Sequence, residues 1–260
     1  FRNEINPRNF TFRSREFEQA ELEFFCHPDE SARWFEHWRE ERLRFHRELG
    51  FREENLRIRP HEKDELAHYA RDAVDVEYRF PFGWQEIEGI HDRGTWDLSQ
   101  HAEFSGKDLS VTDEETKERF VPAVVETSMG VDRTVLALLC DAWAVEELEG
   151  GETRNVLRFA PRVAPIKVAV LPLSKKLAEP ARRIAARLRR RWNVFYDESG
   201  NIGRRYRRQD EVGTPFCVTW DFDSEGDGRV TVRERDSMRQ ERVPVDALGA
   251  WLGERLEEAP

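Results

Sequence analysis

The chain has 260 residues, of which 38% are hydrophobic and 36% charged, and its net charge is -10. This composition is typical of a globular protein with one large or two ordinary domains. No apolar run approaches the roughly 20 residues that cross a bilayer, which argues against a membrane protein and a membrane partner. Cys26, Cys140 and Cys217 form no CxxC pair. We therefore expect a reducing compartment, the cytoplasm, rather than a disulfide framework or a zinc site.

The first 25 residues predict an antiparallel hairpin, because two alternating stretches flank a turn-forming segment around Pro7. Phe1 falls inside the first of these strands, so we expect the chain to be the later part of a longer protein. Side chains two apart on a strand share a face. One polar face then presents Arg2 and Glu4, and the other presents Arg13, Arg15, Phe17, Gln19 and Glu21.

The mixture of side chains on this hairpin predicts a nucleotide site. Arginine offers bidentate, permanently charged donors to phosphate oxygens, and an aromatic ring offers a stacking plane for a base. A carboxylate can accept from an amine. Together these groups fit ATP beside an amino acid. The alternative is a solvated sheet face with surface ion pairs, which are common and weakly stabilising.

Two helices and a short strand are predicted next. Residues Pro28–Leu49 form the first helix, because their aromatic residues recur at helical spacing and suit a core. A short strand at Leu56–Ile58 and a second helix at Lys63–Asp72 follow.

A buried strand is predicted at Trp84–Ile90, after a loop rich in Gly and Pro. Glu86 and Glu88 alternate on it with Ile87, so we expect the two carboxylates to share the face opposite the core. In an ATP cavity such a pair suits magnesium or an ammonium group, whereas on an open sheet it would be solvated. Arg93 follows at the strand end, where it could meet phosphate or carboxylate or form a surface ion pair.

A further strand, Phe120–Glu126, leads through a turn of small residues into a predicted helix at Val131–Trp143. This order places backbone N–H groups and Arg133 at a helix N-terminus, a geometry suited to anions. The alternative is a plain strand-to-helix corner.

The best domain boundary is the segment Glu146–Thr153 with its Gly150–Gly151 pair, which separates residues 1–150 from residues 151–260. The second part is expected to be a small α/β domain with a mixed sheet. Its predicted strands are Ile166–Leu171, Val194–Tyr196, Phe216–Phe222 and Arg229–Arg235, and its predicted helices are Ala178–Trp192 and Val245–Leu256.

The charge is distributed unevenly between these parts. Residues 1–150 hold 20 Lys and Arg against 35 Asp and Glu, whereas residues 151–260 hold 22 against 17. A polyanion should therefore prefer the second part. A basic patch with an aromatic residue that could stack on an unpaired base consists of Arg204, Arg205, Tyr206, Arg207 and Arg208. The alternative is a solvated charged face.

Several segments, in collinear order over nearly the whole chain, resemble the class II aminoacyl-tRNA synthetases, in the version found in the dimeric glycyl enzymes. FRNEI followed by R-x-R-E-F-x-Q-A-E-x-E is similar to motif 2, and VVETSMGVDRTVLALL is similar to motif 3. The other segments are FGWQEIEGIHDR, WDLSQH, SGKDLS, APIKVAVLPL and GRRYRRQDEVGTPFCVTWDFD. The chain departs from the commoner Glu-Pro-Ser-Ala-Gly pattern at Thr127 and Met129, so the local turn can differ.

The resemblance implies an α+β fold: part of an antiparallel-sheet catalytic core, followed by a small mixed-sheet anticodon-binding domain. It implies an enzyme that activates glycine with ATP and magnesium to glycyl-adenylate and transfers glycine to tRNA(Gly). It also implies a homodimer formed through motif 1, which is not in this chain. The alternatives are a non-catalytic relative, such as a DNA polymerase accessory subunit, and an adenylating enzyme that never touches tRNA.

The resemblance also implies roles for single residues. Arg2 and Arg133 are the expected catalytic residues, with Arg2 on the α-phosphate. ATP would be held by Arg2, Glu4, Arg13, Phe17, Glu86 and Arg133, with Glu4 reading the adenine amino group and Phe17 stacking on the ring. Glycine would be held by Glu21, Arg93, Glu126 and Ser128, with Glu126 also a candidate magnesium ligand. The tRNA would be contacted by Arg204, Arg205, Tyr206, Arg207 and Arg208.

Overall fold

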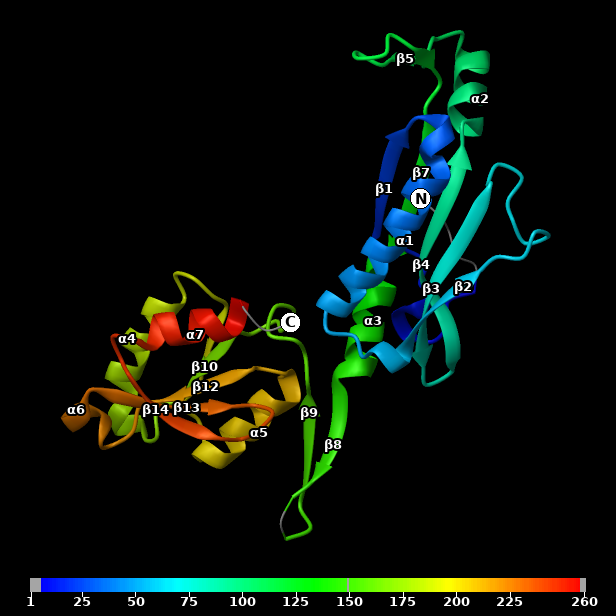
Figure 1. The fold of residues 1–260 in the computed structure, drawn as a ribbon. Helices are drawn as coiled ribbons and strands as arrows, with labels where there is room; N and C mark the ends of the chain where they lie inside the picture. The colour runs from blue at the N-terminus through cyan, green and yellow to red at the C-terminus, as the bar shows by residue number, and fades with distance from the viewer. Residues whose placement is uncertain (1–5, 149, 258–260) are drawn as a thin grey trace. The chain divides into compact units, whose positions relative to one another are not determined.

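The computed structural model describes residues 6–148 and 150–257 and divides the chain into two compact units, Phe1–Asp141 and Ala142–Pro260 (Figure 1). Gly150 and Gly151 lie in the turn of a hairpin formed by β8 (Trp143–Glu147) and β9 (Thr153–Leu157). The division therefore falls earlier in the chain than the glycine pair that we expected to mark it. Among the helices of the described residues, none combines the length and the hydrophobicity that a transmembrane span requires.

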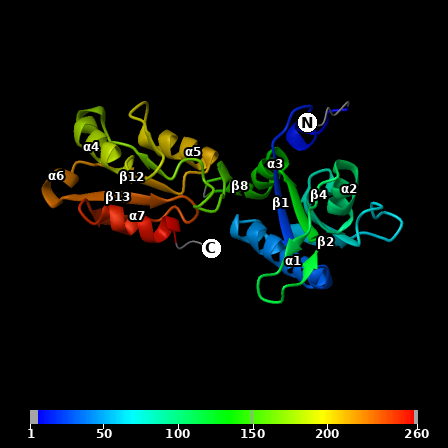
Figure 2. The same ribbon diagram turned by 90° about the horizontal axis from the view of Figure 1, so that it is seen from above.

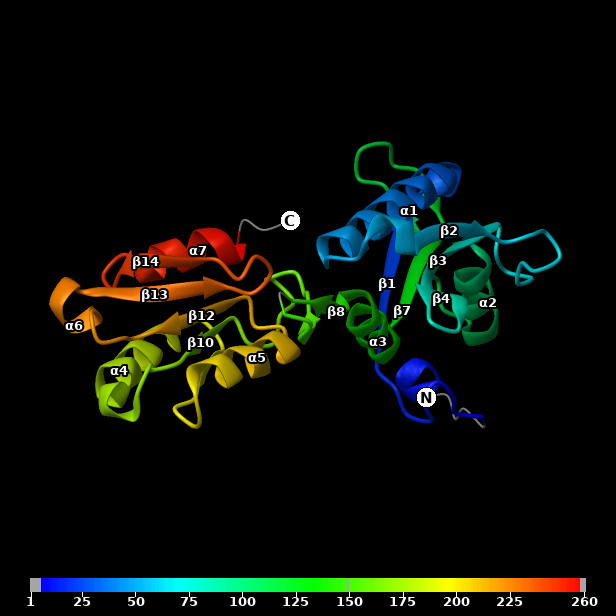
Figure 3. The ribbon, with the colours of Figure 1, turned by 90° about the horizontal axis from the view of Figure 1, so that it is seen from below.

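The first unit is built on a five-stranded antiparallel sheet in the order β1-β7-β4-β3-β2. These strands are β1 (Gln19–Cys26), β7 (Ala123–Gly130), β4 (Gly83–Gly94), β3 (Asp72–Phe80) and β2 (Leu56–Pro60). The long helix α1 (Ser31–Glu48) packs on one face of the sheet, and α2 (Trp96–Ser105) lies on the other side of the strands (Figure 2, Figure 3). The smaller elements are η1 (Phe10–Phe12), η2 (Pro28–Glu30), η3 (Glu53–Asn55), β5 (Val111–Thr112) and β6 (Arg119–Phe120).

The core of this unit lies between the sheet and α1, as the aromatic spacing of the helix predicts. Trp34 and Trp38 pack against Phe24 of β1, with ring centroids 4.6 and 5.6 Å apart, and Phe35 is buried. Helix α3 (Val131–Ala142) continues directly from β7, so the predicted strand and helix are confirmed. The predicted turn of small residues is wrong, because residues 127–130 belong to β7.

Two predictions in the first unit are wrong. Residues 61–71 form turns rather than a helix, and Asp72 then opens β3, where the sequence analysis assigned no strand. The second strand of the predicted hairpin begins only at Gln19, so Arg13 and Phe17 lie in an irregular segment before it. Arg2 and Glu4 lie outside the described residues.

A third correction concerns Glu88. The register of β3 and β4 slips at a bulge, where Val76 pairs with Glu88 but Glu77 pairs with Glu86. The extra residue, Ile87, turns Glu88 towards α1, although strict alternation would place it beside Glu86. The Glu88 side chain is completely buried, against His46 and Arg42 of α1.

The second unit contains a mixed sheet in the order β11-β10-β12-β13-β14, as expected of a small α/β domain. The parallel strands are β11 (Val194–Tyr196), β10 (Val168–Val170) and β12 (Phe216–Thr219), and the antiparallel ones are β13 (Arg229–Glu234) and β14 (Gln240–Pro244). Helices α4 (Ala178–Leu188) and α7 (Leu248–Glu257) cover one face, and α5 (Ile202–Val212) covers the other (Figure 1). The short elements are η4 (Lys175–Leu177) and α6 (Ser224–Asp227).

Candidate active site

The sheet face opposite α1 is polar because the strand register aligns polar residues across it. Glu21 of β1 pairs with Ser128 of β7, which pairs in turn with Gly89 of β4. One step along, Glu23 pairs with Glu126, which pairs with His91. Since side chains two apart share a face, these two rows form one continuous surface.

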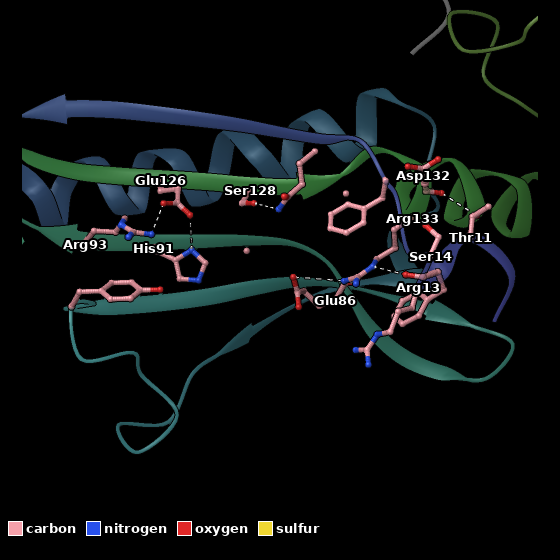
Figure 4. A pocket seen from close by; sticks show the side chains of 16 residues that line it. Thr11, Arg13, Ser14, Glu86, His91, Arg93, Glu126, Ser128, Asp132 and Arg133 are labelled. Carbon is pink, nitrogen blue, oxygen red and sulfur yellow. Dashed lines mark hydrogen bonds and ion pairs between the residues drawn. The ribbon is translucent and has the colours of Figure 1, made fainter. Parts of the chain in front are cut away.

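A cavity of about 400 Å³ lies on this face, within the range of small-molecule sites. Figure 4 shows it as elongated, with Arg93, His91 and Glu126 at one end and Arg13, Arg133 and Asp132 at the other. Its lining comprises Thr11, Phe12, Arg13, Ser14, Phe17, Gln19, Tyr69, Glu86, Gly89, His91, Arg93, Glu126, Ser128, Gly130, Asp132 and Arg133.

Arg93 is held firmly at the first end. Its Nη1 donates to Glu126 Oε2 at 2.5 Å, and its Nε donates to Asp97 Oδ2 at 2.6 Å in the first turn of α2. The hydrogen bonds that Arg93 donates to Asp97, together with the negative charge of Glu126, raise the pKa of Arg93. Partial burial, together with the like charge of Glu126, raises the pKa of Glu23 to about 7. Closely spaced carboxylates around one fixed cation suit a substrate that brings a second positive charge.

Arg133 is fixed at the other end, in the first turn of α3. Its Nη1 donates to the Glu86 carbonyl at 2.8 Å, its Nε donates to the Phe12 carbonyl at 3.3 Å, and its guanidinium lies 4.4 Å from the Phe12 ring centroid. Asp132 ties the start of β1 to this helix by accepting from the Glu18 N–H at 2.9 Å. The result is a positioned cation at a helix N-terminus, which suits a phosphate.

The middle of the cavity carries a chain of neutral and acidic groups. Gln19 Nε2 donates to Ser128 Oγ at 3.2 Å, and Ser128 Oγ donates to Glu21 Oε1 at 3.3 Å. Glu21 therefore reaches the cavity through Ser128, although it is not part of the lining.

The structure thus brings together most of the residues that sequence reasoning assigned to the site, and their individual roles stay predictions. Those that line the cavity are Arg13, Phe17, Glu86, Arg93, Glu126, Ser128 and Arg133. Sequence reasoning missed His91 and Tyr69. His91 could have been found from its two-residue spacing to Arg93 if the predicted strand had been extended beyond Ile90, since β4 continues to Gly94. Tyr69 gave no signal, because it lies in turns that were interpreted as a helix.

The environment of Glu126 does not fit the predicted magnesium site. One of its oxygens accepts from Arg93, and the other lies 4.0 Å from His91 Nδ1. In residues 6–148 and 150–257, no group of three or more His, Cys, Asp or Glu side chains is arranged to hold a metal ion. We therefore assign Glu126 to the ion pair with Arg93.

The predicted tRNA-contacting segment lies within α5, and its side chains differ in how far they are exposed to solvent. Arg205 is only 2% exposed and donates to the carbonyls of Pro172 and Asp197, so it cannot present its charge to RNA in this fold. The Tyr206 hydroxyl lies 2.7 Å from Thr219 Oγ1, so this ring packs on the sheet.

The remaining arginines of this segment lie nearer the surface. Arg207 and Arg208 pair with Asp210 and Asp197 at 3.6 and 2.5 Å. Arg204 is exposed near the start of α5.

Comparisons with known proteins agree with this architecture. A family model described as "tRNA synthetase class II core domain (G, H, P, S and T)" matches residues 1–141, and one described as "Anticodon binding domain" matches residues 167–255. The glycine–tRNA ligase of Lysinibacillus sphaericus is 54% identical over 257 residues, which are 99% of this chain and 56% of that protein. Those of Geobacillus kaustophilus and Caldanaerobacter subterraneus are 54% and 56% identical, over 98% and 99% of this chain and 56% of each relative.

The chain spans little more than half the length of these curated relatives. The core-domain model nevertheless covers more than half of this chain, including every strand and helix that contributes to the cavity. The chain therefore belongs to the class II tRNA synthetase family.

Proposed function

We propose that the full-length protein carrying this chain activates glycine with ATP and transfers it to tRNA(Gly). The observation that carries this proposal is one cavity with two chemically different ends. Arg13, Arg133 and the Phe17 ring suit a triphosphate and a base, whereas Glu126 and Ser128 suit a small substrate with an ammonium group. The choice of glycine is supported by the relatives, whose name is glycine–tRNA ligase.

In the first step, a carboxylate oxygen of glycine attacks the α-phosphorus of ATP, the α–β phosphoanhydride bond breaks, and pyrophosphate leaves. Such a step needs positioning and charge neutralisation more than covalent help from the protein. Arg133 is already fixed by two backbone carbonyls, so it can neutralise phosphate charge without reorganising. The roles of Arg2 at the α-phosphate and Glu4 at the adenine amino group belong to the same proposal.

The second end of the cavity orients the amino acid. Ser128, Glu21 and Glu126 offer oxygens to the ammonium group of glycine, and Arg93 keeps Glu126 in place. In the second step, a hydroxyl of the terminal ribose of tRNA attacks the carbonyl carbon, and AMP leaves. Magnesium would enter with the phosphates of ATP, because the carboxylates of the described part of the chain form no cage for it. The proposal includes a cytoplasmic homodimer whose second unit holds the tRNA.

The test is glycine-dependent exchange of pyrophosphate into ATP, followed by charging of tRNA(Gly), with the full-length protein. Lysine at position 133 keeps the charge but loses the planar fork, so R133K is expected to lower kcat/KM for exchange about 100-fold. The matched control is R33K, because Arg33 is an exposed arginine of α1. Exchange that does not need glycine, or an R133K protein as active as the control, contradicts the proposal. A nucleic-acid-binding relative without catalysis would show no exchange at all.

A further inference from the structure

Residues 61–71 connect β2 to β3 and border the Arg93 end of the cavity without forming a helix or strand. Both ends of this segment are tied to the sheet: the His61 N–H donates to the Ala73 carbonyl at 3.0 Å, and the Arg71 N–H donates to the Asp92 carbonyl at 2.7 Å. Tyr69 is the member of the segment that lines the cavity. Its position is therefore defined by the two strands that the segment joins.

The Tyr69 ring lies on the guanidinium of Arg93, whose central carbon is 4.2 Å from the ring centroid. A guanidinium stacked on an aromatic face keeps its edges free for hydrogen bonds. The edges of Arg93 are indeed occupied by Glu126 and Asp97. Arg93 is thus restrained by two carboxylates in its plane and by one ring across its face.

The Tyr69 ring itself packs against a residue of α2. Trp96 opens α2 and packs on His68 and Tyr69, with ring centroids 4.7 and 5.9 Å away. Asp97, the partner of Arg93, is the next residue along. The start of α2 therefore anchors both the ring and the cation beneath it.

We propose that Tyr69 is a positioning and size-selecting residue: its ring fixes Arg93 for Glu126 and forms the wall that excludes amino acids with a side chain. This inference rests on the proposed activation of glycine. A substrate with one extra methyl group would have to displace the ring, and with it the contact that holds Arg93. Removing the ring should open this wall and loosen the cation, while the distant Arg133 end keeps its own contacts with Phe12 and Glu86.

The test compares the wild type, Y69A and Y69F as full-length proteins in ATP–pyrophosphate exchange with glycine or alanine. Y69A is expected to raise KM for glycine about tenfold, to leave KM for ATP unchanged, and to raise alanine use relative to glycine about tenfold, the scale of one methyl group in a pocket. Y69F keeps the ring and is expected to have the wild-type KM for glycine and the wild-type preference for glycine over alanine. The control is F104A, because Phe104 is 83% exposed on α2 and lies outside the cavity lining.

Each remaining result is decisive. Unchanged KM for glycine and unchanged selectivity in Y69A overturn the inference. Equal increases of KM for glycine and for ATP in Y69A overturn it too, because they indicate general damage to the fold. A Y69F protein that does not have the wild-type values also overturns the inference. A wild type that exchanges pyrophosphate without any need for glycine overturns the proposed function instead.

Discussion

Gly89 shows how much the cavity depends on the absence of a single side chain. It lies in β4 opposite Ser128, in the row of residues that forms the cavity floor. A Cβ built at this position would lie 2.7 Å from His91 Cε1, closer than real Cβ atoms approach other atoms. Alanine there would therefore push the imidazole aside and occupy part of the space proposed for glycine.

We expect G89A to raise KM for glycine in the exchange assay by about tenfold, a loss typical of a change of one methyl group in a binding pocket. KM for ATP should change much less, because the Arg133 end is untouched. G249A is the matched control, because a Cβ at Gly249 in α7 meets nothing within 4 Å. Equal KM values for glycine in G89A and the wild type would show that the floor is not part of the substrate site.

At the scale of elements, the bulge in β4 joins the cavity to the core. Ile87 is the extra residue, so Glu86 faces the cavity while Glu88 faces α1. Glu88 Oε1 accepts from Arg42 Nε at 2.5 Å, and Glu88 Oε2 lies 2.7 Å from His46 Nε2. A buried carboxylate is costly unless it is paired, so these contacts hold the bulge and thereby the orientation of Glu86.

The charge of Glu88 should be visible in the pH dependence of stability. Burial alone would raise its pKa, but the hydrogen bonds from His46 and Arg42 outweigh burial and hold the pKa below its ordinary value of 4.5. A carboxylate with a lowered pKa stabilises the fold above its unfolded-state pKa, and this contribution is lost as the pH falls through the folded-state value. The stabilisation is therefore complete at pH 7 and is lost progressively as the pH falls below 4.5 towards the lowered pKa of the folded state.

We expect E88Q to lower the free energy of unfolding of the first unit by about 3 kcal/mol at pH 7, as when one partner of a buried ion pair is removed. The difference from the wild type should shrink below pH 4.5. Hydrogen exchange of α1 and β4 peptides in urea measures it. E36Q is the control, because Glu36 pairs with Arg39 on the exposed side of α1. A loss in E88Q that is independent of pH would show that packing, and not charge, is the source.

These elements also show what the sequence could and could not predict. α1 and the β7–α3 corner were predictable because their apolar residues keep a regular period. The bulge in β4 was not predictable from the sequence, because no local signal marks Ile87 as the extra residue. That one residue reverses the face of every later side chain on the strand. The segment 61–71 has helix-compatible residues but folds as turns held by the neighbouring strands, so Tyr69 was missed. For the site, residue patterns alone left surface ion pairs and a plain corner open, and it was the resemblance to the synthetases that implied Arg93, Glu126, Ser128 and Arg133, all of which line the cavity.

At the scale of the whole molecule, each unit has its own core, and the charge is divided between them. The apolar cluster of the second unit lies between its mixed sheet and helices α4 and α7, whereas that of the first unit lies under α1. Sequence reasoning interpreted the arginine run of the second unit as one basic surface. The fold separates the run, because a helix turns Arg205 inward and leaves Arg204 outside. Substitution of Arg205 would therefore test stability and not RNA contact.

Substitution of Arg204 is the better test of whether the second unit binds the tRNA that is charged at the first unit. If it approaches a phosphate, R204E should raise KM for tRNA in charging and reduce the salt slope of binding by about one, while glycine-dependent exchange stays unchanged. R239E carries the same change of charge at another exposed position of this unit, between β13 and β14, and serves as the control. Equal effects of the two variants would indicate general electrostatic attraction rather than a contact at α5. A parallel fall in exchange and charging would show that Arg204 acts on the fold, because tRNA takes no part in the exchange reaction.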